Sequence, residues 1–135
     1  MTKEQKELLL KDLCARLDTN LVCSIYRTDD EGVGYRDEIL SGYCKGDIWY
    51  EFYFREDCGI GIDNVSKIKP YLFPLSSMTD EQTEELIKLI NTGQNDNNEF
   101  MRSLCRIEFY HKNHFDYRGL IPMGLANDAT GKNIY

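Results

Sequence analysis

Paired cysteines, prolines and long hydrophobic runs are all scarce or missing in this sequence. The chain has only 3 prolines, and its 5 cysteines are odd in number and never stand at CxxC spacing. A disulfide framework or a structural zinc site is therefore not expected, because both need closely paired ligands. No apolar run is long enough to cross a membrane, and the first residues do not have the pattern of a signal peptide. We therefore expect a cytoplasmic protein without a membrane partner.

Basic side chains are also in the minority. The chain carries 16 lysines and arginines against 23 acidic residues, a formal net charge of −7. This balance argues against direct binding of nucleic acid, which needs a basic surface to neutralise phosphates. The acids cluster at 29–31, 37–38 and 80–85, which leaves open an acidic DNA mimic or nuclease inhibitor as an alternative function. A solvated, solubilising surface is the more ordinary explanation of such clusters.

The length and composition predict one α+β domain over residues 1–135. A chain of 135 residues with 41% hydrophobic side chains can bury a core without disulfides or metals. Apolar residues at three- and four-residue spacing predict helices over 2–17, 79–91 and 98–113. We expect a small, mostly antiparallel sheet that is packed on one face by about three helices.

Two of these helices begin with a capping box, in which each side chain satisfies a free backbone donor of the first turn. The boxes are Thr2 with Gln5 and Thr79 with Gln82. The apolar spacing predicts that the second and third helices bury one side each. The residues expected to face inward are Leu86, Ile87, Leu89, Ile90, Phe100, Met101, Leu104, Cys105 and Phe109.

Strands are expected where apolar and polar residues alternate or where β-branched residues gather. The patterns predict strands over 21–27, 38–44, 47–55 and 58–63. The glycine-containing segment 29–38 has the composition of a polar loop. Residues 65–78 contain two prolines and are expected to form an extended, irregular crossing segment.

DIWYEFYFR, residues 47–55, is the clearest strand pattern in the chain. Because side chains alternate between the two faces of a strand, Phe52 and Phe54 are expected to point inward. The opposite face carries Trp49, Tyr53 and Arg55, which form our candidate interaction surface, since Trp and Tyr are enriched at protein interfaces. The alternative is that the segment 65–78 or the C-terminal tail covers this face.

HKNHFDYRGL, residues 111–120, concentrates the side chains that could bind a metal. His111 and His114 stand three residues apart, on one side of a helix, and Asp116 follows two residues later. These three residues are the candidate ligands of a metal-assisted enzyme. Zinc sites, however, recruit ligands from more than one element, and the chain has only 2 histidines.

The same residues also fit a polar clasp that holds the chain in shape, and we favour this interpretation. His111 would lie near the C-terminal end of a helix, where exposed carbonyls favour it. Asp116 would cap a turn, Gly119 would adopt a left-handed conformation, and Arg118 would pair with a carboxylate. We therefore expect no metal and no other cofactor.

Motifs of catalysis are not found elsewhere in the chain. GVG (32–34) and GIG (59–61) do not complete the GxGxxG pattern of dinucleotide binding, and no GxSxG occurs. No residue is therefore assigned a catalytic role, and we expect the protein not to be an enzyme.

Several strings resemble those of a group of short proteins of gut anaerobic bacteria that are associated with prophages and other mobile elements. The strings are KELLLKDLCARL near the start, IKPYLFPLSSMT in the middle, and NHFDYRGLI followed by GLANDATGKNIY at the end. The resemblance implies no activity and no catalytic residue. It favours a small accessory protein that binds another protein, whose oligomeric state remains open.

Overall fold

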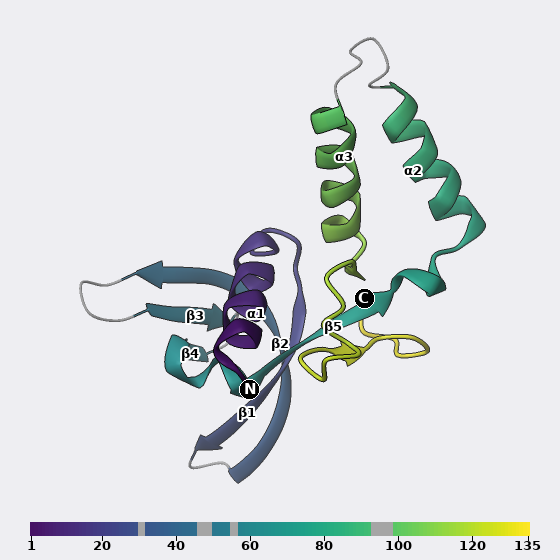
Figure 1. Ribbon diagram of the computed structural model, residues 1–135. Coiled ribbons are helices and arrows are strands. Elements are labelled where there is room, and N and C mark those ends of the chain that lie inside the picture. The colour runs from purple at the N-terminus through teal and green to yellow at the C-terminus, as the bar shows by residue number, and fades with distance from the viewer. Residues whose placement is uncertain (30–31, 46–49, 55–56, 93–98) are drawn as a thin grey trace.

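The computed structural model describes residues 1–29, 32–45, 50–54, 57–92 and 99–135. Three α-helices, two 3₁₀ segments and a set of strands follow one another in this part of the chain (Figure 1). In chain order they are α1 (Lys3–Ala15), β1 (Val22–Asp29), β2 (Gly32–Lys45), β3 (Tyr50–Phe54), β4 (Asp57–Gly61), η1 (Ile62–Lys67), β5 (Ile68–Pro74), η2 (Leu75–Ser77), α2 (Asp80–Thr92), α3 (Glu99–Lys112), β6 (Phe115–Asp116) and β7 (Asn127–Asp128).

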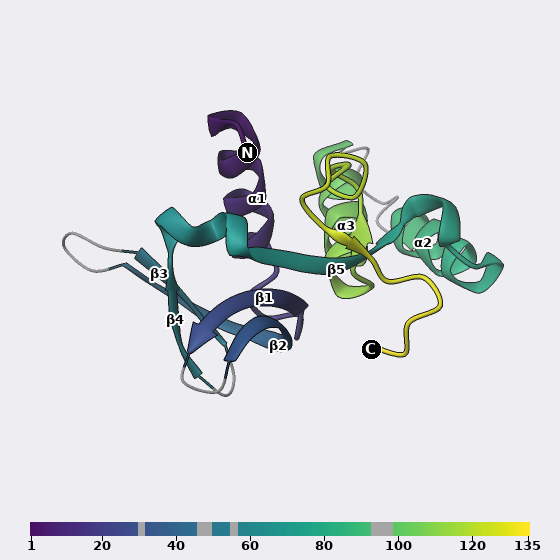
Figure 2. The same cartoon turned by 90° about the horizontal axis from the view of Figure 1, so that it is seen from below.

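The described strands form one sheet in the order β4-β3-β2-β1-β5-β6, and β7 also pairs with β5. Neighbouring strands from β4 to β5 are antiparallel, whereas the two-residue strands β6 and β7 run parallel to β5. The expected α+β class and mostly antiparallel sheet are therefore confirmed. The strand β5 extends from the bent sheet toward the pair of helices α2 and α3 (Figure 2).

Helix α1 covers the sheet and supplies its share of the core. Its capping box is confirmed, since the Thr2 side chain accepts a hydrogen bond from the Gln5 amide at 3.2 Å and the Gln5 side chain accepts one from the Thr2 amide at 2.8 Å. Leu9 and Leu13 are almost completely buried. They pack in one cluster with residues of β1, β2, β3 and β5, among them Ile25 of β1. Burial of such side chains is the main favourable term in folding.

Helices α2 and α3 are arranged differently from the prediction. They pack against each other as an antiparallel pair that stands away from the sheet (Figure 1). No residue of α2 is buried, and Phe109 is the buried residue of α3. Of the side chains predicted to face inward, Leu86, Ile90 and Cys105 are half-buried, and the others are exposed: Ile87, Leu89, Phe100, Met101 and Leu104.

The predicted loop over 29–38 is wrong, because β2 continues through most of it. Residues Gly32–Ile39 of this strand pair with β1 along the whole length of β1. Cross-strand contacts compensate for its polar composition. Arg27 forms an ion pair with Glu38 at 3.2 Å, and the rings of Tyr26 and Tyr35 meet edge to face at 5.1 Å. The polar residues of this segment are therefore explained by a paired strand that has one side toward solvent, and not by a loop.

The segment 65–78 is more regular than its prolines suggested. It contains the end of η1, the strand β5 and η2. β5 pairs with β1 only from Ile68 to Pro70, and then pairs with the short strands β6 and β7. A proline lacks the amide donor of a strand, so it is tolerated where a strand exchanges one partner for another.

The inward face of the pattern 47–55 is confirmed where the structure describes it. Phe52 and Phe54 of β3 are at most 3% exposed. None of the described helices combines the length and apolar character that a membrane span requires.

Candidate functional site

The turn after α3 is organised by one carboxylate. Asp116 accepts hydrogen bonds from the amides of Leu120 and Ile121, each at 2.8 Å, through its two oxygens. Gly119 lies between Asp116 and these two amides in the sequence. Its φ is +74°, a left-handed conformation in which a side chain would be strained. Both predicted roles, the capping by Asp116 and the left-handed Gly119, are confirmed.

A buried carboxylate on α1 joins this turn to the N-terminal helix. Asp12 accepts a hydrogen bond from Nε of Arg118 at 3.0 Å and another from Nε of Arg16 at 2.8 Å. Asp12 and Arg16 have no exposed side-chain surface, and Arg118 is 16% exposed. The predicted pairing of Arg118 with a carboxylate is therefore confirmed, and its partner lies 106 positions away.

Arg16 extends the same network to the backbone of the C-terminal third. Its guanidinium donates to the carbonyl of Phe115 at 2.8 Å and to the carbonyl of Tyr110 at 3.4 Å. Sequence reasoning missed Asp12 and Arg16. A signal was present, since both charges stand at i,i+4 spacing beside Leu13 on the apolar stripe of α1. A charged pair on a buried stripe needs partners, because isolated charges are costly to bury.

Aromatic rings complete the network, which we call the polar clasp: Asp12, Arg16, His111, Tyr117 and Arg118. Nε2 of His111 and the Tyr117 hydroxyl lie 2.9 Å apart, and the Arg118 guanidinium lies 4.7 Å from the centre of the Tyr117 ring. Burial lowers the pKa of His111 and raises the pKa of Tyr117. Both shifts favour the neutral forms, so the contact between His111 and Tyr117 is a hydrogen bond between two uncharged groups.

His114 ends the helical segment and packs on the last residue of the sequence. Its backbone has φ +57°, and its ring stacks on Tyr135 with centroids 3.9 Å apart. Burial, with a smaller contribution from Arg16, lowers the pKa of His114 to about 4. The Tyr135 hydroxyl donates to the carbonyl of Tyr71 at 2.7 Å. His114 therefore helps to hold the C-terminal residue Tyr135 against β5.

The structure does not assemble the predicted metal ligands. His111 contacts Tyr117, His114 stacks on Tyr135, and Asp116 binds backbone amides. Within the described ranges, no three side chains of His, Cys, Asp or Glu come together as a metal site. The metal-assisted enzyme therefore gains no support from this geometry.

The predicted interaction surface of Trp49, Tyr53 and Arg55 stays a prediction. Trp49 and Arg55 lie outside the described residues. Tyr53 is half-buried, and its hydroxyl donates to the Glu51 carboxylate at 3.2 Å. The acidic segment 29–31 also lies largely outside the described residues, so the hypothesis of a DNA mimic is equally untested.

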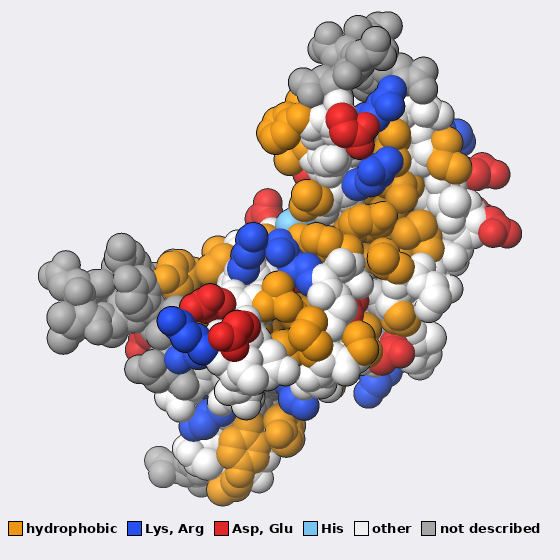
Figure 3. Space-filling model, viewed as in Figure 1, with side chains coloured by type: hydrophobic (Ala, Val, Ile, Leu, Met, Phe, Trp, Pro, Cys, Tyr) orange, Lys and Arg blue, Asp and Glu red, His pale blue; other side chains and the backbone are white. Residues whose placement is uncertain are grey.

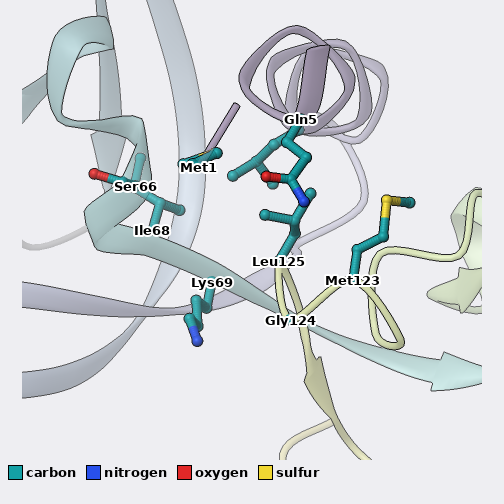
Figure 4. Close-up of a pocket in the computed structure, with 9 residues that line it drawn as sticks. Met1, Gln5, Ser66, Ile68, Lys69, Met123, Gly124 and Leu125 are labelled. Atoms are coloured by element: carbon teal, nitrogen blue, oxygen red, sulfur yellow. The ribbon is translucent and has the colours of Figure 1, made fainter. Parts of the chain in front are cut away.

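A small pocket opens between α1, the start of β5 and the segment before β7 (Figure 4). Its volume is about 270 Å³, and Gln5 reaches from α1 toward Leu125 across it. The pocket is lined by Met1, Gln5, Leu9, Ser66, Ile68, Lys69, Met123, Gly124 and Leu125. Its polar groups are few and do not converge in a pattern of catalysis.

A second, open cleft of about 550 Å³ lies between the ends of α1 and α3. It is lined by Ala15, Asp18, Thr19, Asn20, Glu108, His111 and Lys112. His111 is the member of the polar clasp that reaches this cleft, and its pKa is lowered, so it offers a neutral imidazole. Charges of both signs line the cleft, so its electrostatics do not select an anion or a cation.

Exposed apolar side chains also occur on the paired helices α2 and α3. Hydrophobic side chains gather over both helices and between them (Figure 3). We call the exposed apolar side chains of the two helices the apolar helical face: Ile87, Leu89, Met101, Leu104 and Ile107, which are 37–51% exposed. Met101, Leu104 and Ile107 follow one another at three-residue spacing along α3, whereas Ile87 and Leu89 lie on different sides of α2. Sequence analysis found both amphipathic helices, but it assigned their apolar sides to the interior. The spacing of apolar residues shows that a helix has an apolar side, but it does not show what covers that side.

Comparison of the chain with protein-family models, with curated proteins and with solved structures finds no match. The function is therefore argued from the geometry of the described residues.

Proposed function

We propose that the protein is a non-catalytic protein-binding module, and that the apolar helical face is its contact surface. The observation that carries this proposal is the exposure of α2. Its sequence is amphipathic, yet none of its residues is buried. The partner that fits this face is a protein with its own amphipathic helical surface.

The length of α2 supports the proposal. A helix of 13 residues is marginal by itself in water, and most of its stability in proteins comes from packing of its apolar side. Within the chain, α2 packs against α3, and Ile87 and Leu89 remain 51% and 40% exposed. A partner on this face would supply the packing that the chain itself does not.

The size of the face gives a second argument. On α3 it extends over two turns, because Met101, Leu104 and Ile107 stand at three-residue spacing and are 37–42% exposed. Single exposed hydrophobic residues are ordinary, but contiguous apolar patches of a few hundred Å² mark interaction sites on many monomers. We therefore prefer this face to the untested Trp49 surface as the site of contact.

The polar clasp supports the non-catalytic part of the proposal. Asp12 and Asp116 are buried, and their oxygens accept hydrogen bonds from arginines and from backbone amides. Arg16 is fully buried, and its guanidinium is bound to Asp12 and to two carbonyls. Groups so engaged stabilise the fold and are not free to bind a substrate.

The resemblance to accessory proteins of prophages and mobile elements, which is carried by strings at both ends of the chain, supports the same class of function. We propose on that ground alone that the partner is another cytoplasmic protein encoded with the element or by its host.

Site-specific photo-crosslinking tests the proposal. A photoreactive amino acid is placed at Leu104 on the face, and the matched control is placed at Arg106, two positions along α3 and on its other side. Illumination of full-length protein at its native expression level should attach polypeptide at position 104 and not at position 106. Equal yields at both positions, or no adduct at 104, would exclude this face as a protein-binding surface.

A further inference from the structure

We propose that the pocket between α1 and the start of β5 binds a small uncharged molecule that joins an apolar ring or chain to a hydrogen-bond acceptor. This site is separate from the proposed contact surface on α2 and α3. Segments far apart in the sequence meet around it (Figure 4), and they contribute Gln5 and Leu9 from α1, Ile68 from β5, and Leu125 from the segment before β7. Concave sites with apolar walls and a few placed polar groups are where small ligands bind.

The volume of the pocket limits the size of the ligand. Apolar cavities of about 150 Å³ bind benzene. This pocket has a volume of about 270 Å³. In proportion, it holds a molecule of roughly ten non-hydrogen atoms. A compound with one ring, or a short chain with one functional group, therefore fits, whereas a nucleotide or a flavin is too large to be enclosed.

The walls of the pocket provide the apolar contact. Five of its nine lining residues have apolar side chains: Met1, Leu9, Ile68, Met123 and Leu125. Leu9, Ile68 and Leu125 are at most 7% exposed and belong to the core cluster, so they form a fixed floor. Met1 and Met123 are 53% and 39% exposed, so they lie at the edge. Because methionine side chains are flexible and polarisable, this edge can adapt to the shape of a ligand.

One oriented donor selects an acceptor on the ligand. The side-chain oxygen of Gln5 accepts a hydrogen bond from the Thr2 amide at 2.8 Å in the capping box of α1. This bond fixes which end of the Gln5 amide is the oxygen. The amide nitrogen then lies on the side of Leu125, across the pocket (Figure 4). Its N–H groups can donate only to an acceptor, such as a carbonyl or hydroxyl oxygen.

Charge excludes an ionised ligand. Lys69 is the one charged side chain among the nine lining residues, and none of them is a carboxylate. The side chain of Lys69 runs away from the pocket (Figure 4), so its ammonium group does not face a bound molecule. A charged ligand would lose hydration here without gaining an opposite charge, which favours an uncharged one.

Nuclear magnetic resonance of methionine methyl groups tests the proposal with the full-length protein. The probe is acetophenone, which joins one ring to one carbonyl acceptor. The chain has 4 methionines, of which Met1 and Met123 line the pocket, whereas Met78 and Met101 do not and serve as internal controls. We expect saturable shifts of the first two methyl signals only, with a dissociation constant of about 1 mM or lower.

Gln5→Glu is the matched variant, because its carboxylate can still accept the Thr2 amide and keep the capping box. It replaces the N–H donors by an oxygen that repels the carbonyl of the probe. The dissociation constant of acetophenone should rise at least about fivefold, the contribution of one lost hydrogen bond. The constant of ethylbenzene, which has a similar shape and no acceptor, should change less than about twofold.

Circular dichroism melting curves verify that the variants are folded. The proposal is wrong if acetophenone gives no saturable shift, if all four methyl signals shift alike, or if Gln5→Glu binds acetophenone as tightly as the wild type. Lys69→Gln should leave the affinity for acetophenone unchanged, and a change would show that the ligand class is wrong. None of these measurements involves α2 or α3, so such a failure leaves the proposed function standing.

Discussion

Asp12 is the residue on which the polar clasp depends, because it accepts hydrogen bonds from two arginines of different segments. Arg16 caps the C-terminal end of α1, and Arg118 belongs to the turn after β6. Replacing a buried ion pair by apolar residues often has little cost, whereas removing one partner leaves a buried charge uncompensated. The clasp should therefore be most sensitive to the loss of its shared carboxylate.

Asp12→Ala should lower the free energy of unfolding by about 3–5 kcal/mol, measured by urea denaturation. The fully buried Arg16 would lose the carboxylate that is ion-paired with it and could not reach water without opening the packing of α1. The control is Glu7→Ala on the same helix, which removes an exposed ion pair with Lys3 at 3.9 Å and should have little effect. Equal effects of both substitutions would show that the clasp is not a stabilising unit.

His114 makes stability depend on pH in the acid range. Its pKa is lowered from 6.5 to about 4 by burial and, less strongly, by Arg16. Above pH 6.5 neither the folded nor the unfolded state binds the proton. As pH falls from 6.5 toward 4, the unfolded state takes up a proton that the folded state does not, so the free energy of unfolding decreases.

His114→Asn should remove this part of the pH dependence. Asparagine tolerates the positive φ of this position and does not titrate. The difference in unfolding free energy between the wild type and the variant should shrink as pH falls from 6.5 to 4. Denaturation curves at four or five pH values measure it, and a constant difference over that range would show that His114 is not buried in its neutral form.

At the scale of elements, α1 and α2 form a natural comparison. Both have 13 residues, and both begin with a Thr–Gln capping box. They differ in burial, since α1 buries Leu9, Asp12 and Leu13 and α2 buries none of its residues. The two helices therefore have the same local start signal and the same length, and differ in how many of their side chains are packed in the core.

Amide hydrogen exchange should be much faster in α2 than in α1 when the protein is dilute. Protection reflects the free energy of local opening, which is low where few apolar contacts are buried. Mass spectrometry of peptides from both helices measures the rates in one sample. If α2 is as protected as α1 in dilute monomer, its stability does not depend on a partner, and the argument for the contact surface from α2 is wrong.

At the scale of the molecule, the last residues connect parts that are far apart in the sequence. The Tyr135 hydroxyl donates to the carbonyl of Tyr71 on β5 and accepts from the amide of Val22 on β1, at 2.7 Å and 3.3 Å. The Tyr135 ring also packs on His114 and, at 5.9 Å between centroids, on Phe73. One side chain thus connects the sheet to the turn after α3.

Tyr135→Phe should lower the free energy of unfolding by about 1 kcal/mol, because the ring contacts remain and two hydrogen bonds are lost. Urea denaturation at neutral pH measures it. Tyr35→Phe, at a position that is 64% exposed, should have a smaller effect. Equal effects would mean that the Tyr135 hydroxyl is not part of the native packing.

The features that the sequence determined by itself are those made by residues close together in the chain. Both capping boxes, the turn bound by Asp116 and the left-handed Gly119 involve partners within five positions, and the structure confirms each of them. The α+β class followed in the same way from local spacing of apolar residues. Such contacts depend on neighbours that the sequence displays directly.

The tertiary structure alone decided which partners the distant residues have. Arg16 binds the carbonyl of Phe115, 99 positions away, and no local pattern specifies that pairing. The apolar side of α3 was visible in the sequence, yet only the fold left Leu104 and Ile107 exposed. The physical reason is that burial is not directional: an apolar side chain is stabilised by any apolar neighbour, from its own chain or from another.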